Sequence, residues 1–252
     1  MKILFLGDIV GKATVAYLQK NLWALRKARG VDLVLANGEN ATEILGLSRD
    51  NAQDLLSAGV DVITGGNHTL HNADLYNMLG DSPYLLRPYN LPAAAPGKGE
   101  TIVEAGGRRV LVLNLVGMHD MVYAGNPFEA ADRILAHNAG KYDVAVCDIH
   151  AEATAEKIAL GYYLDGRVQL VVGTHTHVQT ADETILPGGT AYITDLGMCG
   201  PQNGVLGADR EVILRKLKTA TPQRYKVADG APVLHGVLVT LDGDRAVAIE
   251  RI

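Results

Sequence analysis

The sequence has few of the features that mark secreted or membrane-spanning proteins. The two cysteines, Cys147 and Cys199, stand far apart and form no C-x-x-C motif, so we expect no disulfide framework. The apolar run at the N-terminus is too short for a signal peptide, and no apolar stretch approaches the roughly 18 residues of a membrane span. We therefore expect a cytoplasmic protein with no membrane partner.

Blocks of basic residues and aromatic side chains are also scarce. The net charge is −5 and aromatic residues make up 5% of the chain, which argues against general nucleic-acid binding and against a stacking platform for single strands. Apolar residues, by contrast, make up 48% of the 252 residues, enough for one large core. Because no linker or internal repeat interrupts the chain, residues 1–252 are interpreted as a single domain.

Short runs rich in valine, isoleucine and leucine alternate with helical patterns, and this alternation predicts an α/β fold whose first half is largely parallel. The expected strands are residues 2–6, 33–36, 62–64, 109–115, 144–148, 170–173, 191–194 and 233–240. The expected helices are residues 15–29, 51–58, 73–79, 130–139 and 153–164. From residue 186 onward, closely spaced strand patterns and a hairpin loop at 241–244 predict an antiparallel part.

Five of the predicted strands end in carboxylate, amide or imidazole side chains, which are the kinds of group that can bind metals. These residues are Asp8, Glu39, Asn40, Asn67, His68, His150, His175 and His177. Ligands bind outside the carboxyl ends of the strands in open α/β sheets, so we expect these side chains to converge. A mixture of carboxylate, amide and imidazole groups suits borderline-hard divalent ions, and a shared carboxylate can bridge a pair of them.

Each motif has a simpler interpretation when it is taken alone. Gly7-Asp8 is also typical of a turn or helix cap, and Asn37-Gly38-Glu39-Asn40 is typical of a surface turn. In an extended segment, residues i and i+2 point to one face, so His175 and His177 are expected to face the same point. Together with His150 one strand earlier, this pair favours metal binding over an unrelated surface pair.

The motifs resemble those of the calcineurin-like metallophosphoesterases. More narrowly, they are similar to the bacterial YmdB-type branch, which is associated with 2′,3′-cyclic-nucleotide phosphodiesterase activity. The closer likeness lies in residues 37–41, 148–154, 175–183 and 189–198. The resemblance implies a four-layer α/β/β/α sandwich, in which helices flank two mixed β-sheets.

The resemblance also implies two metal ions, most often iron or manganese, with magnesium or zinc as alternatives. It implies one ion on Asp8 and His177, with Glu39 bridging to the other. The second ion would be held by Asn67, His150 and His175. Asn40 would lie beside the metals and contact an ion or the phosphate, and His68 would be the acid next to the leaving group.

On this resemblance the expected reaction is hydrolysis of a small-molecule phosphoester, with a metal-held hydroxide attacking phosphorus. A 2′,3′-cyclic nucleotide would yield a 3′-nucleotide. The same ligands would serve a phosphomonoesterase, or a regulatory protein whose metal site senses a phosphorylated ligand. The resemblance is also compatible with a homo-oligomer.

Two positions depart from the related patterns. Val10 stands where the broader superfamily usually has a histidine, a loss that the YmdB-type branch shares. Leu70-His71 stands where that branch has Trp-Asp, directly after the motif that holds His68. The second departure bears on the support of His68 and on substrate preference.

Overall fold

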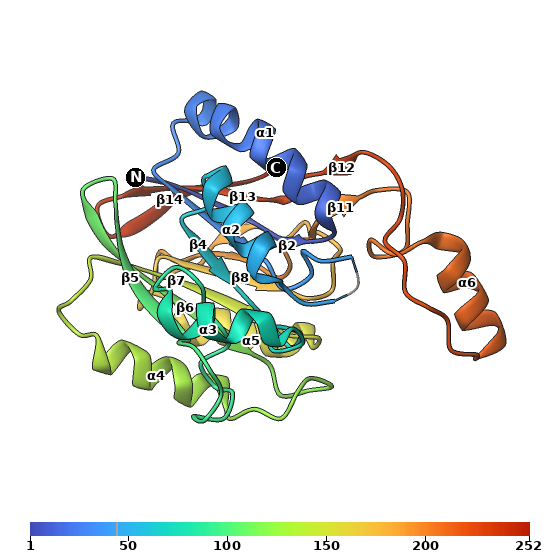
Figure 1. Ribbon diagram of the computed structural model, residues 1–252. Helices are drawn as coiled ribbons and strands as arrows, with labels where there is room; N and C mark the ends of the chain where they lie inside the picture. The colour runs from blue at the N-terminus through green and yellow to red at the C-terminus, as the bar shows by residue number, and fades with distance from the viewer. Residues whose placement is uncertain (44) are drawn as a thin grey trace.

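The computed structural model describes residues 1–43 and 45–252, and it stacks two β-sheets between outer layers of helices (Figure 1). A five-stranded sheet has the order β14-β13-β1-β3-β4, and a six-stranded sheet has the order β5-β6-β7-β8-β10-β9. A further three-stranded sheet, β12-β11-β2, was not expected. The predicted fold class, an α/β sandwich of mixed sheets flanked by helices, is confirmed.

Strands and helices alternate along the first two thirds of the chain, and strands predominate toward its end. The strands are β1 (Lys2–Leu6), β2 (Asp8–Ile9), β3 (Leu33–Asn37), β4 (Val62–Thr64), β5 (Glu100–Ala105), β6 (Arg108–Val116), β7 (Val144–His150), β8 (Leu170–Thr174), β9 (Thr184–Ile185), β10 (Ala191–Ile193), β11 (Met198–Pro201), β12 (Pro232–Val233), β13 (Gly236–Asp242) and β14 (Arg245–Arg251). The helices are α1 (Lys12–Arg29), α2 (Arg49–Ala58), the 3-10 helix η1 (Ala73–Leu75), α3 (Tyr76–Asp81), α4 (Pro127–His137), α5 (Thr154–Leu164) and α6 (Arg210–Thr219).

Three apolar clusters hold the layers together. The central cluster lies between the two large sheets, where Phe5 and Leu35 of one sheet and Val112 and Val146 of the other are fully buried. A second cluster packs α1 and α2 on the five-stranded sheet, and a third packs α4 and α5 on the six-stranded sheet. Strands covered on both faces need apolar residues at consecutive positions, which explains the unbroken apolar runs in the sequence.

The C-terminal part is only partly antiparallel, so that prediction is corrected. Strands β13 and β14 form the expected antiparallel hairpin, and β13 also pairs antiparallel with β1. In contrast, β10 pairs parallel with β8, and β11 pairs parallel with β2. The connection between β8 and β10 carries His175 and His177 and is long enough to return the chain in the same direction.

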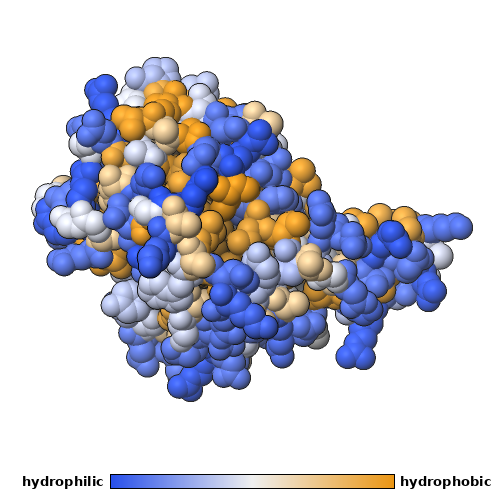
Figure 2. Space-filling model, turned by 90° about the horizontal axis from the view of Figure 1, so that it is seen from above, coloured by the Kyte–Doolittle hydropathy of each residue, from blue (hydrophilic) through white to orange (hydrophobic). Residues whose placement is uncertain are grey.

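Residues 202–231, which we call the α6 arm, project from the body of the molecule (Figures 1 and 2). Helix α6 has no buried residue, and its first turn is capped by Asp209, whose side chain accepts the Val212 N–H at 3.0 Å. Hydrogen bonds from Asp209 N to the Lys226 carbonyl and from Ala228 N to the Gly207 carbonyl close the arm at its root. Within the described ranges, none of the helices is long and apolar enough to cross a membrane.

Candidate metal centre

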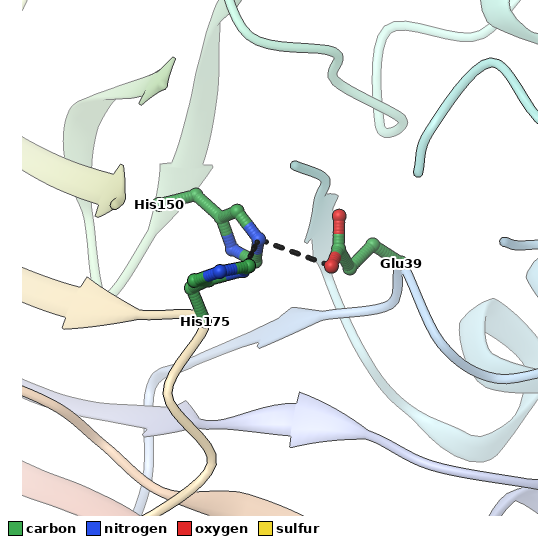
Figure 3. Close-up of side chains that lie close together, drawn as sticks. All are labelled: Glu39, His150 and His175. Carbon is green, nitrogen blue, oxygen red and sulfur yellow. Dashed lines mark hydrogen bonds and ion pairs between the residues drawn. The ribbon is translucent and has the colours of Figure 1, made fainter. Parts of the chain in front are cut away.

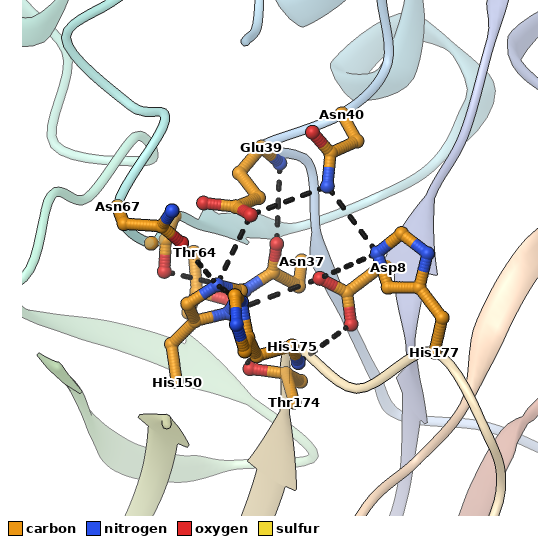
Figure 4. A network of polar contacts seen from close by, with 12 residues as sticks. Asp8, Asn37, Glu39, Asn40, Thr64, Asn67, His150, Thr174, His175 and His177 are labelled. Atoms are coloured by element: carbon orange, nitrogen blue, oxygen red, sulfur yellow. Dashed lines mark hydrogen bonds and ion pairs between the residues drawn. The ribbon is translucent and has the colours of Figure 1, made fainter. Parts of the chain in front are cut away.

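The residues that the sequence predicts to bind metals gather at one site (Figure 4), and His68 lies beside them, with its Nδ1 3.1 Å from Asn40 Oδ1. Strands β1, β3 and β4 of the five-stranded sheet lead to Asp8, to Glu39 and Asn40, and to Asn67 and His68. Strands β7 and β8 of the facing sheet lead to His150, His175 and His177. The parallel strands of both sheets therefore end at the same place. Metal binding by these residues is untested and stays a prediction.

The ligand atoms of Glu39, Asn67 and His175 surround Nε2 of His150. That nitrogen lies 3.0 Å from Glu39 Oε1 and 3.0 Å from His175 Nδ1 (Figure 3), and it lies 3.0 Å from Asn67 Oδ1. The N–H at Nε2 of His150 can be donated to only one of these three acceptors at a time. The lone pairs of the other two acceptors then face each other without a proton between them. A cation shared by these atoms would remove that repulsion, and the donor set fits a divalent metal.

Asp8 contributes a buried carboxylate oxygen that lacks a partner. Its Oδ2 accepts the backbone N–H of His175 at 3.2 Å, whereas Oδ1 has no hydrogen-bond partner among the described residues. Oδ1 lies 3.8 Å from both His150 Nδ1 and His177 Nε2. Burial raises the pKa of this carboxyl group, because its negative charge is poorly solvated, and a metal ion at this position would stabilise the ionised form.

Gly66 leaves the space that the converging side chains occupy. A Cβ atom at this position would collide with Glu39 Oε2 and with the imidazole ring of His150. The close approach of these side chains therefore requires a glycine beside Asn67.

The charges of the site also favour a cation. Burial lowers the pKa of His150, but the negative charge and hydrogen bond of Glu39 outweigh it and raise the pKa to about 9.

Glu39 shows the complementary shift in pKa. Burial would raise the pKa of its carboxyl group, but the charge and hydrogen bond of His150 and the contacts with His68 hold it well below its usual value. The carboxylate is therefore strongly favoured in its ionised form. An ionised carboxylate next to an environment that stabilises positive charge is suited to a bridging ligand between metal ions.

Second partners set the ring tautomers of His150 and His175. The Thr174 hydroxyl donates to Asp148 at 2.8 Å, so it accepts from Nδ1 of His150 at 2.9 Å and leaves Nε2 free as a ligand. Nε2 of His175 lies 3.1 Å from the Glu152 carboxylate, which leaves Nδ1 facing the centre. Carboxylates and hydroxyls behind ligand imidazoles commonly have this role. The likeness to the related motifs included Asp148 and Glu152 but assigned them no role.

The backbone of the histidine pair differs from the expected extended segment. His175 and His177 have φ angles of 101° and 64°, both in the left-handed region that non-glycine residues rarely adopt. Both side chains face the centre because the chain bends here. The expected extended conformation, in which residues i and i+2 point to one face, was therefore wrong. Hydrogen bonds compensate for the left-handed conformation: Thr176 between them donates its N–H and its hydroxyl to Asp195 Oδ2 at 3.1 and 2.8 Å.

Asp195 is itself held by a buried lysine that the sequence pattern does not reveal. Lys157 Nζ lies 2.7 Å from Asp195 Oδ2, and both side chains are only 1% exposed. Asp195 Oδ1 also accepts the Gly197 N–H at 2.8 Å. Lysine on a helix is usually exposed, so only the tertiary structure indicates this role. The pair connects α5 to the bend that carries His175 and His177.

His68 lies beside the ligands and is oriented by them. Its backbone N–H donates to Glu39 Oε2 at 3.0 Å, and its Nδ1 lies 3.1 Å from Asn40 Oδ1. Its ring meets the ring of His71 edge to face, with the centroids 5.1 Å apart. His71, one of the two residues that depart from the related motif, therefore contacts His68 through its imidazole ring. Nδ2 of Asn40 lies 3.3 Å from His177 Nε2, which places the amide between the ligand groups.

Comparisons with known proteins agree over nearly the whole chain. A family model described as YmdB-like protein matches residues 4–252. A Bacillus subtilis (strain 168) protein named 2′,3′-cyclic-nucleotide 2′-phosphodiesterase is 45% identical over 254 residues, which cover 100% of this chain and 96% of the relative.

Two solved structures share both fold and sequence with this chain. A protein from Thermus thermophilus superposes with a TM-score of 0.93 at 39% identity, covering 100% of this chain and 98% of the other. A phosphatase from Mycoplasma pneumoniae superposes with a TM-score of 0.93 at 34% identity, covering 100% of this chain and 92% of the other. Both matches extend through the residues of the candidate centre, because they cover the full chain.

Proposed function

The chain belongs to the YmdB-like protein family, and from this premise we propose that it is a dinuclear metal-dependent phosphodiesterase. The proposed substrate is a 2′,3′-cyclic nucleotide and the product a 3′-nucleotide, in keeping with the name of the Bacillus subtilis relative. The observation that carries the proposal is the convergence of Glu39, Asn67 and His175 on His150, next to an unpartnered oxygen of Asp8.

The ligand set divides into two groups that would each hold an ion. Asp8 and His177 form one group, and Asn67, His150 and His175 form the other. Glu39 would bridge the ions, for which we propose iron or manganese. Two bound ions would supply a water of lowered pKa and positive charge opposite the phosphoryl oxygens. The amides of Asn40 and Asn67 are assigned to the rim of the phosphate site.

We assign His68 as the general acid. Because Asn40 and Glu39 hold its Nδ1, the proton for the leaving group is assigned to Nε2. Water adds to phosphorus, the bond from phosphorus to the ribose 2′ oxygen breaks, and the Nε2 proton passes to that oxygen. The products are a 3′-phosphate and a free 2′ hydroxyl. Proton transfer of this kind contributes about 10²–10⁴-fold to a rate.

The test uses metal-loaded protein and a panel of 2′,3′-cyclic nucleotides, a 3′,5′-cyclic nucleotide and a phosphomonoester, with product identification by chromatography. We expect Glu39→Ala to lose bound metal and turnover together. We expect His68→Ala to keep its metal and lose about 10²–10⁴-fold in turnover. His137→Ala, an exposed histidine on α4, is the matched control and should behave as the parent.

Several outcomes would decide against the proposal. Full turnover of the 2′,3′-cyclic nucleotides by both Glu39→Ala and His68→Ala would exclude the assigned mechanism. Turnover of the phosphomonoester alone would identify a phosphomonoesterase on the same ligand set. Tight nucleotide binding with slow turnover of every substrate would instead indicate a regulatory protein.

A further inference from the structure

Arg87 is a buried cation that has no carboxylate partner in the described part of the chain, in contrast to Lys157. Its side chain is 7% exposed, and Nη1 donates to the carbonyl oxygens of Pro88 and Tyr89 at 2.7 and 3.0 Å. Its Nε is buried and has no hydrogen-bond partner among residues 1–43 and 45–252. Arginine keeps its charge inside proteins and is almost never fully buried unless it is paired. Among the described residues, the charge of Arg87 is therefore met by carbonyl oxygens alone.

Arg87 lines a cavity of about 590 Å³ that contains no residue of the candidate metal centre. Lys98 and Arg133 line the same cavity, so positive charge predominates on its wall. Cavities of about 300–1,000 Å³ typically hold small molecules. The volume is thus sufficient for a ligand as large as a mononucleotide.

One carboxyl group, Glu100, also lines the cavity, and it does not neutralise Arg87. Its Oε2 is buried without a hydrogen-bond partner among the described residues. Burial raises the pKa of this carboxyl group, so its negative charge is disfavoured. Arg87 and Glu100 therefore both line the cavity, and each has one buried polar atom without a partner among the described residues.

Backbone hydrogen bonds fix the walls of the cavity. The Arg87 N–H donates to the Lys98 carbonyl at 2.9 Å, and the Tyr89 N–H donates to the Asn114 carbonyl of β6 at 2.8 Å. The Asn90 side chain donates to the carbonyl oxygens of Val116 and Gly125, each at 2.7 Å. A cavity held in this way is preformed, so a ligand loses little free energy in ordering it.

We propose that this cavity is a second ligand site, which binds a small phosphorylated molecule through Arg87, Lys98 and Arg133. A phosphate group matches a set of neighbouring cations, and the guanidinium of arginine presents donors that suit its oxygens. The site does not depend on the function proposed for the metal centre, because the two share no residue.

Crystals of the metal-loaded protein soaked in selenate, a tetrahedral dianion with an anomalous signal, test the location. We expect an anomalous peak beside the Arg87 guanidinium in the parent and in Arg215→Gln, an exposed α6 control, but not in Arg87→Gln. A peak at the metal centre is a separate event and bears on the other proposal. Absence of a peak at Arg87 in the parent, or its persistence in Arg87→Gln, would overturn this one.

Titration calorimetry with inorganic phosphate tests the same site in solution. In the metal-loaded parent we expect a binding event at the cavity in addition to any phosphate binding at the metal centre. Arg87→Gln should weaken the cavity event by about tenfold to a hundredfold, as loss of a charged hydrogen bond predicts. Lys98→Gln changes an exposed side chain and serves if Arg87→Gln fails to fold; it should weaken the same event. Unchanged phosphate binding in the folded variants would show that the cavity is not an anion site.

Discussion

The carboxyl edge, by which we mean the strand ends that carry the candidate metal centre, differs from the α6 arm in what holds its side chains in place. At the edge, Asp8, Glu39 and His150 are at most 1% exposed, and partners from distant parts of the chain hold them. In the arm, Leu214 and Leu217 are 52% and 76% exposed, and Figure 2 shows the arm as a largely hydrophilic projection. The first region is therefore specified by tertiary contacts and the second by local signals.

Helix α6 forms where a capping aspartate begins it and basic residues occupy its last turn. Asp209 accepts a backbone N–H, and Lys216 and Lys218 lie near the carboxyl end, where they stabilise the helix dipole. The root of the arm is different, because the Leu206 carbonyl lies 3.1 Å from Nδ1 of His177. The boundary between the two regions thus falls inside the arm, between its root and α6.

The largest expected effect comes from a ligand at the edge, Asp8→Asn, compared with Asp229→Asn in the arm. Loss of a carboxylate ligand should weaken metal binding by more than about 100-fold, beyond what loss of an outer partner causes. Because Oδ1 of Asp8 accepts no hydrogen bond, Asp8→Asn should melt no lower than the parent in EDTA. Metal titration and thermal melting measure both effects, and equal metal affinity in the two variants would contradict the ligand assignment.

The second comparison sets Lys157→Met against Lys218→Met, an exposed lysine of α6. Removing one member of a buried ion pair costs about 3–5 kcal/mol, and the bend at Thr176 should also lose its support. We therefore expect lower stability together with metal affinity reduced by about 10–100-fold. Lys218→Met should change neither quantity.

A double variant separates the two roles of Lys157. In Lys157→Met with Asp195→Asn, no unpaired charge is left, and the introduced amide oxygen can still accept from Thr176. The amide NH2 group would then face the Gly197 N–H, so stability and metal affinity should recover together but only in part. Reduced stability with unchanged metal affinity in Lys157→Met would show that the ion pair serves packing alone and does not position the ligand histidines.

The same contrast explains which parts of the fold could be predicted from the sequence. Strand β1 and the central strands were predicted because burial on both faces requires apolar runs that are visible locally. Strand β5 was missed, since it lies at the edge of its sheet and is mostly half-buried, so its pattern is not strongly apolar. Helix α6 was missed for a related reason: no core selects an apolar face on it.

At the centre, the sequence predicted which residues meet but not how they are held. The strand ends located the residues that converge, since parallel strands of one sheet end at one edge. The left-handed bend at His175 and His177 depends on Asp195, which comes from a later part of the chain. The buried charge of Lys157 was invisible for the same reason, because helix periodicity does not reveal a partner from another element.

The third comparison concerns packing, and it sets Leu160→Ala against Leu217→Ala. Leu160 on α5 is fully buried against the six-stranded sheet, whereas Leu217 is mostly exposed. A buried leucine replaced by alanine costs about 2–5 kcal/mol, since a cavity remains. Chemical denaturation should show this loss for Leu160→Ala and at most about 0.5 kcal/mol for Leu217→Ala. A larger loss at Leu217 would mean that this side chain is covered in solution.

The smallest effect is expected from removing α6 altogether. Asp209 N donates to the Lys226 carbonyl at 2.8 Å, so residues 210–225 can be replaced by a short glycine link without moving the root. Because α6 buries none of its residues, the free energy of unfolding should change by less than about 1 kcal/mol. For a domain of this size, that limit corresponds to a Tm shift of at most about 2–4 °C. Metal affinity should be unchanged, since the Leu206 carbonyl that contacts His177 is retained. A substantially lower Tm that depends on protein concentration would instead show that α6 packs on a second copy of the chain, and the two regions would then share one mode of stabilisation.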